Sequence, residues 1–268
     1  MARGLNQVVL LGSVTQTPDL RYTPGGLAIL EITLAGTDRI SDENGNLREL
    51  PWYHRVKLFG RYAEALADQV AAGRTGLAVG RLEYRTWEAE GGKRSALDVR
   101  ADRFELLELD RATTSTDAKG QERLAEAVNQ VYLIGNLTRE PELRYTPQGV
   151  AVSRLGLAVN ERFVTKGQEQ EKTNFVDITA WRELAEWTGD LSKGGGVFVQ
   201  GRLINDSWTS QTGERRFATR IEAHRMGRLE RFAAGSAETA KPTGKRSVPD
   251  IEEGLLEEDF PSEEDLPF

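Results

Sequence analysis

The sequence predicts an all-β protein built from two small barrels in tandem, and three observations lead to this fold class. Leu5–Ala35 aligns without a gap on Val128–Ala158, so the chain repeats itself at an offset of 123 residues. Each copy holds short runs rich in β-branched and aromatic residues, separated by turn residues. Each copy also has a single helical pattern, which follows the third of these runs. A repeat of this length indicates duplicated domains and not a solenoid of short units.

The elements follow the same order in both copies. The first strand runs into a glycine at "QVVLLG" and "QVYLIG", and a turn follows at "RYTP". A second strand ("LAILEITLA", "VAVSRLGLA") and a third ("VKLFG", "ITAW") come next. Helices are predicted over residues 61–72 and 182–193, each ended by glycine. Two more strands complete each copy. Five strands with one helix favour the five-stranded Greek-key barrel known as the OB-fold over a small sandwich.

The "RYTP" turns differ in the residues that follow proline. In the first copy Pro24 and Gly25 suit the two central positions of a type II turn. In the second copy Pro147 is followed by Gln148, and Gly149 comes at the fourth position, which suits type I. The sequence therefore predicts two turns of different type at equivalent places.

Composition divides the chain into four predicted segments. The first OB-fold occupies residues 1–109 and the second residues 128–229. Residues 110–127 are polar and poor in large apolar residues, as is typical of a linker. Residues 230–268 are rich in small, polar and acidic residues. They cannot bury enough apolar surface to offset the entropy of ordering, so a disordered acidic tail is predicted.

Charge is distributed unevenly along the chain. Residues 234–268 hold ten of the 42 acidic residues and three of the 35 basic ones, so the net charge of −7 arises in the tail. The neutral body can still gather basic residues on one face for a polyanion. The absence of cysteine excludes disulfides and thiolate metal sites and favours a reducing compartment. No segment approaches the roughly 18 apolar residues of a membrane span, so the cytoplasm is the expected location.

The third strand of each copy combines aromatic and basic residues on one face. Side chains alternate across a strand, so one face of the first copy's strand carries Tyr53, Arg55, Lys57 and Phe59. The equivalent face of the second copy carries Phe175, Asp177, Thr179 and Trp181. Large rings on a solvated face indicate a ligand. Stacked bases beside cations that follow the phosphates are how single-stranded nucleic acids are bound. The alternative is that these rings cover a loop or a subunit interface.

A second pattern, Gly-Arg-Leu-x4-Trp, also occurs in both copies. Arg81 and Trp87 share a face of one predicted strand, as do Arg202 and Trp208 in the other copy. Each tryptophan lies near the tip of a predicted hairpin, where there is little core to enter, which favours contact with bases over packing. Basic residues near the two tips fit contacts to phosphates: Lys93, Arg94, Arg215 and Arg216.

These motifs together resemble bacterial single-stranded DNA-binding proteins, in the variant with two OB-folds per chain. The resemblance rests on the opening strands, both "LRYTP" loops, "WYHRVKLFGR", both "GRLx4W" stretches and the final "EEDLPF". It implies single-stranded DNA as ligand, a homodimer that supplies four OB-folds and pairs through the opening strands, and roles in DNA replication, recombination and repair. It also implies a further stacking ring at Phe163, where the first copy has Ile40.

The resemblance gives the last residues a role of their own. An acidic tip of this type recruits replication, repair and recombination proteins. Its carboxylates attract a basic partner, and apolar side chains beside a proline fill a pocket. The predicted partner-binding residues are Asp265, Leu266, Pro267 and Phe268. A tail kept only for solubility would explain the acids, but not the apolar terminus.

The sequence does not favour an enzyme. Its two histidines, His54 and His224, lie at different positions of the two copies, and no catalytic triad, HExxH or P-loop motif is present. No metal site and no cofactor are therefore predicted. The remaining alternative is an OB-fold adaptor that binds RNA or protein, which the fold alone does not exclude.

Overall fold

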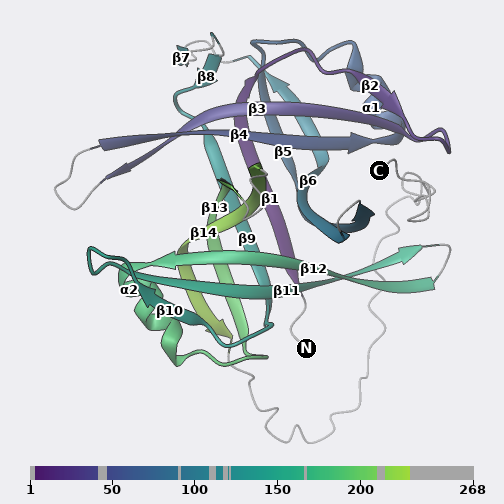
Figure 1. The fold of residues 1–268 in the computed structure, drawn as a ribbon. Coiled ribbons are helices and arrows are strands. Elements are labelled where there is room, and N and C mark those ends of the chain that lie inside the picture. Colours follow the sequence, from purple (N-terminus) through teal and green to yellow (C-terminus); the bar gives the residue numbers. More distant parts are fainter. Residues whose placement is uncertain are drawn as a thin grey trace, which may run out of the picture.

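The computed structural model describes residues 4–41, 47–89, 92–108, 113–116, 120, 122–165, 168–209 and 215–229. They form two barrels, one above the other in Figure 1, connected through a pair of strands near the middle. The predicted tail, residues 230–268, lies outside the described residues. Among the residues described, no helix is long and apolar enough to cross a membrane.

The first barrel has five strands. They are β1 (Leu5–Val14), β3 (Ala28–Ser41), β4 (Leu47–Phe59), β5 (Thr75–Ala89) and β6 (Gly92–Leu107). β1 pairs antiparallel with β3 and with β5, β3 with β4, and β5 with β6. A parallel contact between β4 and β6 closes the barrel. The short strand β2 (Leu20–Tyr22) extends the sheet beside β3, and helix α1 (Gly60–Ala67) follows β4.

The second barrel repeats this closure. Its strands are β9 (Val128–Leu137), β11 (Ala151–Thr165), β12 (Gln168–Trp181), β13 (Gly196–Thr209) and β14 (Arg215–Leu229), with the short β10 (Glu142–Tyr145) beside β11. Helix α2 (Arg182–Trp187) and the 3-10 helix η1 (Thr188–Asp190) follow β12. The predicted all-β class, with two tandem five-stranded OB-folds and one helix in each, is confirmed.

Both helices are shorter than predicted. α1 ends at Ala67 and α2 at Trp187, whereas the sequence pattern extended to residues 72 and 193. The pattern was extended by Val70 and Leu191, which are 1% and 5% exposed although they lie beyond the helices. Their side chains reach the core from a turn, because an apolar residue packs on the core wherever the chain brings it close.

The two "RYTP" turns have the same geometry. The amide of Gly26 donates to the carbonyl of Thr23 over 2.9 Å, and that of Gly149 donates to Thr146 over 2.8 Å. Positive φ values fall on Gly26 (85°) and Gly149 (79°), at the fourth position of each turn. A type II turn requires positive φ at the third position. The predicted type II turn in the first copy is therefore wrong.

The opening strands of the two barrels pair with each other. β1 lies antiparallel to β9, with Leu5 opposite Ile134 and Leu11 opposite Val128. An overlapping stretch of β1, from Val8 to Ser13, pairs with β5 on the other side of the strand. The sheet of the first barrel thus continues into that of the second. Pairing through opening strands, which the resemblance placed between chains, occurs within one chain.

The predicted linker contains regular structure. β7 (Thr114–Thr116) and β8 (Glu122–Leu124) pair antiparallel, and β8 adds to the sheet beside β3. Leu124 is 1% exposed. The connection between the barrels therefore packs along the first of them.

Candidate nucleic-acid interface

The predicted alternation along β4 is present in the structure. Val56 and Leu58 are fully buried, whereas Arg55 on the opposite face has a side chain that is 70% exposed. Tyr53, Lys57 and Phe59 on that face are half-buried. The guanidinium carbon of Arg100, on β6, lies 4.7 Å from the centre of the Phe59 ring. We call the solvent side of β3, β4, β6 and β5 the outer face of the first barrel.

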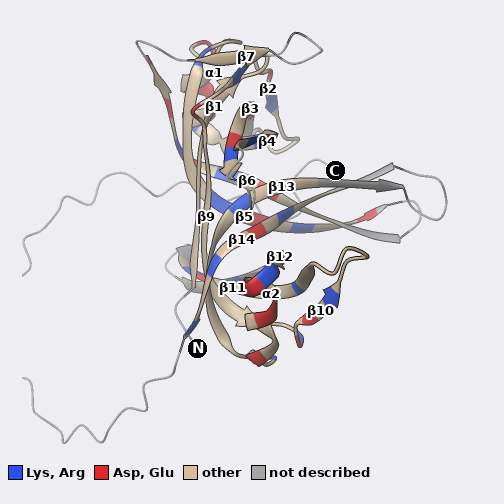
Figure 2. Cartoon of the chain, turned by 90° about the vertical axis from the view of Figure 1, so that its left-hand side faces the viewer, with Lys and Arg blue, Asp and Glu red and all other residues tan. Residues whose placement is uncertain are grey.

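Cations on this outer face share carboxylates. Lys57 Nζ lies 3.2 Å from Asp98 Oδ2, and Arg85 Nε donates to the same oxygen over 2.6 Å. Glu31 lies between Arg55 and Lys57, at 3.5 and 3.9 Å. The basic residues of the face are thus fixed by acidic neighbours. Figure 2 shows the same alternation more widely, with basic and acidic positions interspersed along both barrels.

β5 brings its tryptophan to the same face. Arg85 Cζ lies 6.0 Å from the centre of the Trp87 ring, so the two side chains lie on one side of the strand. The guanidinium of Arg85 therefore lies between the Trp87 ring and the Asp98 carboxylate. A half-buried ring held beside a guanidinium suits a base that stacks while its phosphate meets the cation.

β12 presents the rings of the second barrel. Phe175 is 50% and Trp181 40% exposed. Asp177 between them lies 3.6 Å from Arg139. Thr179, which the sequence placed on the same face, is only 8% exposed. The second barrel therefore offers two exposed rings and fewer cations along this strand.

Phe163 occupies the long hairpin of β11 and β12. It is 36% exposed, as a residue that stacks on a base has to be. In Figure 1 this hairpin projects to one side of the molecule, and the equivalent hairpin of β3 and β4 projects to the opposite side. Both hairpins project beyond the barrels.

The side chains of several predicted site residues lie outside the described residues. Five of them belong to the strands β6, β13 and β14: Lys93, Arg94, Trp208, Arg215 and Arg216. The predicted partner-binding tip also lies outside: Asp265, Leu266, Pro267 and Phe268. Their predicted contacts stay predictions.

Arg202 does not lie where a phosphate contact requires. It is 6% exposed, and its Nη1 donates to Asp38 Oδ2 over 3.0 Å while Nη2 donates to Glu222 Oε1 over 2.7 Å. Asp38 belongs to the first barrel and Arg202 to the second. The predicted DNA contact of Arg202 is therefore corrected to a contact between barrels, because the other barrel covers the face on which Arg202 lies.

Arg81 forms the equivalent contact in the opposite direction. Its Nη1 donates to Asp102 Oδ1 over 2.9 Å, and its Nε lies 3.8 Å from Glu161 Oε2 in the second barrel. Glu161 aligns with Asp38 in the repeat, so the two arginines are related by the duplication. The Arg81 side chain is 30% exposed, which leaves it partly open to solvent.

A bulge beside each of these arginines explains the glycine that precedes it. Pairing between β5 and β6 shifts at Gly80, and pairing between β13 and β14 shifts at Gly201. A Cβ at Gly80 would lie 2.0 Å from the Arg100 carbonyl oxygen, and one at Gly201 would lie 2.2 Å from that of Glu222. Only glycine permits so close an approach of the strands.

His54 lies buried at the junction of the barrels. Its Nε2 is 3.2 Å from the Leu203 carbonyl oxygen of β13, and its ring stacks on Trp52 at 5.2 Å. Burial, together with the nearby charge of Arg202, lowers the pKa of His54 to about 4, in spite of the hydrogen bond to Leu203. The imidazole is therefore neutral at neutral pH and serves packing, not acid–base chemistry.

The comparisons with known proteins agree with this geometry. The model of the single-strand binding protein family matches residues 5–107 and 128–229, which together make up most of the chain. This chain belongs to that family. Each match coincides with one barrel, so the family unit occurs twice.

Some relatives within the family share the whole length of the chain. The "Single-stranded DNA-binding protein" of Thermus aquaticus is 58% identical over 268 residues, with both chains covered completely. That of Deinococcus radiodurans is 44% identical over 304 residues, again with complete coverage. The crystal structure of the wild-type single-stranded DNA binding protein from Thermus aquaticus superposes with a TM-score of 0.71 at 50% identity, over 88% of this chain and 98% of that one.

The structure also brings forward residues that the sequence interpretation missed. Arg85 and Arg100 lie on the outer face of the first barrel, and Lys172 reaches it from β12 of the second. Strand parity could have found Arg85, two residues before Trp87, but no pattern within one copy indicates Lys172. Within the described residues, no group of three or more His, Cys, Asp or Glu side chains is arranged to hold a metal ion.

Proposed function

We propose that this protein binds single-stranded DNA without sequence preference and protects it during replication, recombination and repair. The observation that carries the proposal is the pair of faces on β4 and β12: half-buried rings lie beside Arg55 and Lys57 on β4, and two exposed rings lie on β12. Membership of the single-strand binding protein family supports it, as do the full-length relatives, which are single-stranded DNA-binding proteins. The protein acts by binding and not by catalysis.

The contacts divide between bases and phosphates. Rings such as Phe59, Trp87, Phe175 and Trp181 stack on bases, each contributing roughly 1–3 kcal/mol. Arg55 and neighbouring cations attract the phosphates, so affinity falls as salt concentration rises. Every base has a π-face, and therefore neither kind of contact reads the sequence.

Quenching of tryptophan fluorescence tests this proposal. Trp181 is 40% exposed and Trp87 is half-buried, so bases stacked on them should quench emission when oligo(dT) is added. Duplex DNA of the same length should quench little, because its bases are not free to stack. Stronger quenching by single-stranded RNA, or none by either nucleic acid, would instead favour the OB-fold adaptor that binds RNA or protein.

We propose further that two chains associate as a homodimer with four OB-folds. Both edges of β1 are occupied within the chain, by β5 and β9, so the second chain has to dock elsewhere. Light scattering on a sizing column should give twice the chain mass of 29.8 kDa. A mass of one chain at micromolar concentration would contradict the homodimer.

We propose that the acidic tip recruits replication, repair and recombination proteins. We propose also that the protein works in the cytoplasm, at the nucleoid. The support is chemical: the chain ends in acids followed by "LPF", a segment suited to a basic pocket with an apolar floor. Deleting the last ten residues should leave affinity for oligo(dT) intact or raised and abolish capture of such proteins. A large loss of DNA affinity would contradict this role.

A further inference from the structure

Charged side chains on the outer face of the first barrel form a row across neighbouring strands. The strand register places Glu31 opposite Lys57, Lys57 opposite Arg100, and Asp98 opposite Glu83. The row therefore runs across β3, β4, β6 and β5. Leu82 and Val99 beside it are buried, which confirms that the charged residues lie on the solvent side.

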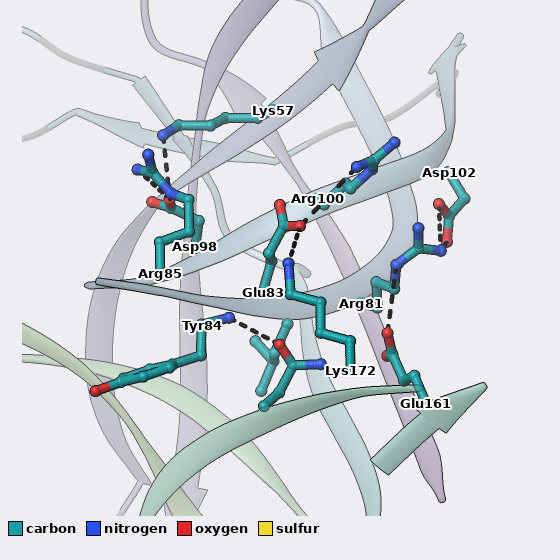
Figure 3. A network of polar contacts seen from close by, with 12 residues as sticks. Lys57, Arg81, Glu83, Tyr84, Arg85, Asp98, Arg100, Asp102, Glu161 and Lys172 are labelled. Carbon is teal, nitrogen blue, oxygen red and sulfur yellow. Dashed lines mark hydrogen bonds and ion pairs between the residues drawn. The ribbon is translucent and has the colours of Figure 1, made fainter. Parts of the chain in front are cut away.

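Each carboxylate in this row lies between two cations. Besides Glu31 and Asp98, whose contacts are given above, Glu83 Oε1 accepts a hydrogen bond from Lys172 Nζ over 2.8 Å and lies 3.9 Å from Arg100 Nη1 (Figure 3). We call the five cations together the cation row: Arg55, Lys57, Arg85, Arg100 and Lys172. Three carboxylates leave this row with two excess positive charges.

Lys172 extends the row from the first barrel to the second. It belongs to β12, next to the stretch that holds Phe175, whereas Glu83 belongs to β5. The ring of Phe175 in turn meets Tyr84 of β5 edge-on, with 5.6 Å between ring centres. The cations of the first barrel thus end beside the stacking ring of the second.

The fold itself does not require this ionic bridge. The duplication aligns Glu83 with Ile204 and Lys172 with Leu50, so the equivalent junction on the other side has two apolar residues. A pair needed only for docking the barrels can be apolar, and burying ions for stability alone is seldom favourable. The charges on this side therefore call for a different explanation.

We propose that the cation row is a phosphate-binding track along which one DNA strand passes from the first barrel onto the second. The proposal rests on the proposed function and adds the crossing point, with Arg100 and Lys172 as phosphate ligands. Because each carboxylate is shared, the cations are held apart and in place while retaining N–H groups for phosphate oxygens. Glu83 occupies the crossing point until a phosphate replaces it.

The electrostatics of Glu83 agree with this role. Burial raises its pKa, but the hydrogen bond and charge of Lys172, with the charges of Arg100 and Arg81, outweigh burial and lower it. Glu83 is therefore ionised at neutral pH and competes with a phosphate for both cations. Neutralising Glu83 should favour DNA, whereas neutralising Lys172 should weaken it.

The experiment compares Lys172→Gln and Glu83→Gln in the full chain. Each is titrated at several salt concentrations with oligo(dT) of roughly 10 nucleotides, which one OB-fold accommodates, and of roughly 30, which has to reach two. Lys172→Gln should reduce the salt dependence of binding by about one phosphate contact, a slope change of about 0.7, for the long oligonucleotide alone. Glu83→Gln should tighten binding of the long oligonucleotide. Lys193→Gln, an exposed lysine of the same barrel, should change neither.

Each outcome decides between explanations. If Lys172→Gln and Glu83→Gln both weaken the long complex, the pair only docks the barrels and the track is refuted. An equal change for both lengths, or none, also refutes the crossing point. If the unaltered protein binds neither oligonucleotide, the proposed function fails instead. Thermal unfolding of both variants shows whether an affinity change follows from lost folding.

Discussion

Arg202 and Asp38, from different barrels, form an ion pair with 7% and 15% of their side chains exposed. A second carboxylate, Glu222, completes the coordination of the guanidinium. A buried charge of this type is costly when its partner is removed. The pair therefore helps to hold the two barrels together, and its loss should lower the free energy of unfolding.

Arg202→Met should destabilise the protein by up to about 3–5 kcal/mol, because it leaves two partly buried carboxylates, Asp38 and Glu222, without their shared cation. Chemical denaturation gives the free energy of unfolding. Arg81→Met is the matched control, and its loss should be smaller because Arg81 is 30% exposed and lies 3.8 Å from Glu161. If Arg202→Met weakened DNA binding while stability stayed unchanged, the predicted phosphate contact would be reinstated.

Trp181→Ala and Phe59→Ala should each weaken binding of oligo(dT) by about 1–3 kcal/mol, through loss of one stacked base. Fluorescence anisotropy of a labelled oligonucleotide measures the change. Leu143→Ala is a suitable control, since Leu143 is a 37% exposed apolar residue of β10 whose cross-strand row, through Ser153 and Ala180, does not include Trp181. Equal losses for all three variants would mean that exposure, not position on β4 or β12, governs the effect.

Gly201→Ala should lower stability by about 1–3 kcal/mol or more, since the added Cβ would overlap the Glu222 carbonyl oxygen and push β13 and β14 apart. The shift in melting temperature reports it. Gly189→Ala should be harmless, because its Cβ would meet no atom within 4 Å. A stable Gly201→Ala protein would show that the bulge can relax.

His54 makes stability depend on pH between about 4 and 6.5. Its folded pKa of about 4 lies below the ordinary value of 6.5, so in this window the unfolded chain binds more protons than the folded one. The contribution of neutral His54 to the free energy of unfolding is therefore fully present above pH 6.5. It is lost as the pH falls toward 4, by roughly 3 kcal/mol. Denaturation at pH 7 and at pH 4.5 measures the loss.

His54→Val, which introduces the residue of the second copy, should reduce this pH dependence. A part remains, because burial also lowers the pKa of His224. If His54→Val lost stability toward acid as steeply as the unaltered chain, His54 would not be the group that titrates.

Much of the outer face could be predicted from sequence, because alternation is a local property of a strand. Tyr53, Arg55 and Phe59 lie opposite buried Val56 and Leu58 as expected. Parity also predicted that Arg202 shares a face with Trp208, whose side chain lies outside the described residues. It could not show that Asp38 of the other barrel covers that face, because such a contact depends on how β1 and β9 pair.

The turns and helix ends show a second limit. Gly25 and Gly26 are adjacent, and either can take positive φ, so the residues alone did not decide between two turn types. Val70 and Leu191 continued an apolar stripe past the true helix ends. Lys172 was missed because its partner Glu83 is 89 residues away in the chain.

Because β1 and β9 belong to one chain, the junction between the barrels joins two domains that need not be identical. Where two identical subunits meet, every substitution enters the interface at two places at once. Here each substitution enters once, and the two halves have diverged: His54 lies where the second copy has Val176, and Glu83 where it has Ile204. The half of the junction around His54 can therefore be selected for packing of the barrels, while the half around Glu83 is selected for the passage of DNA between them.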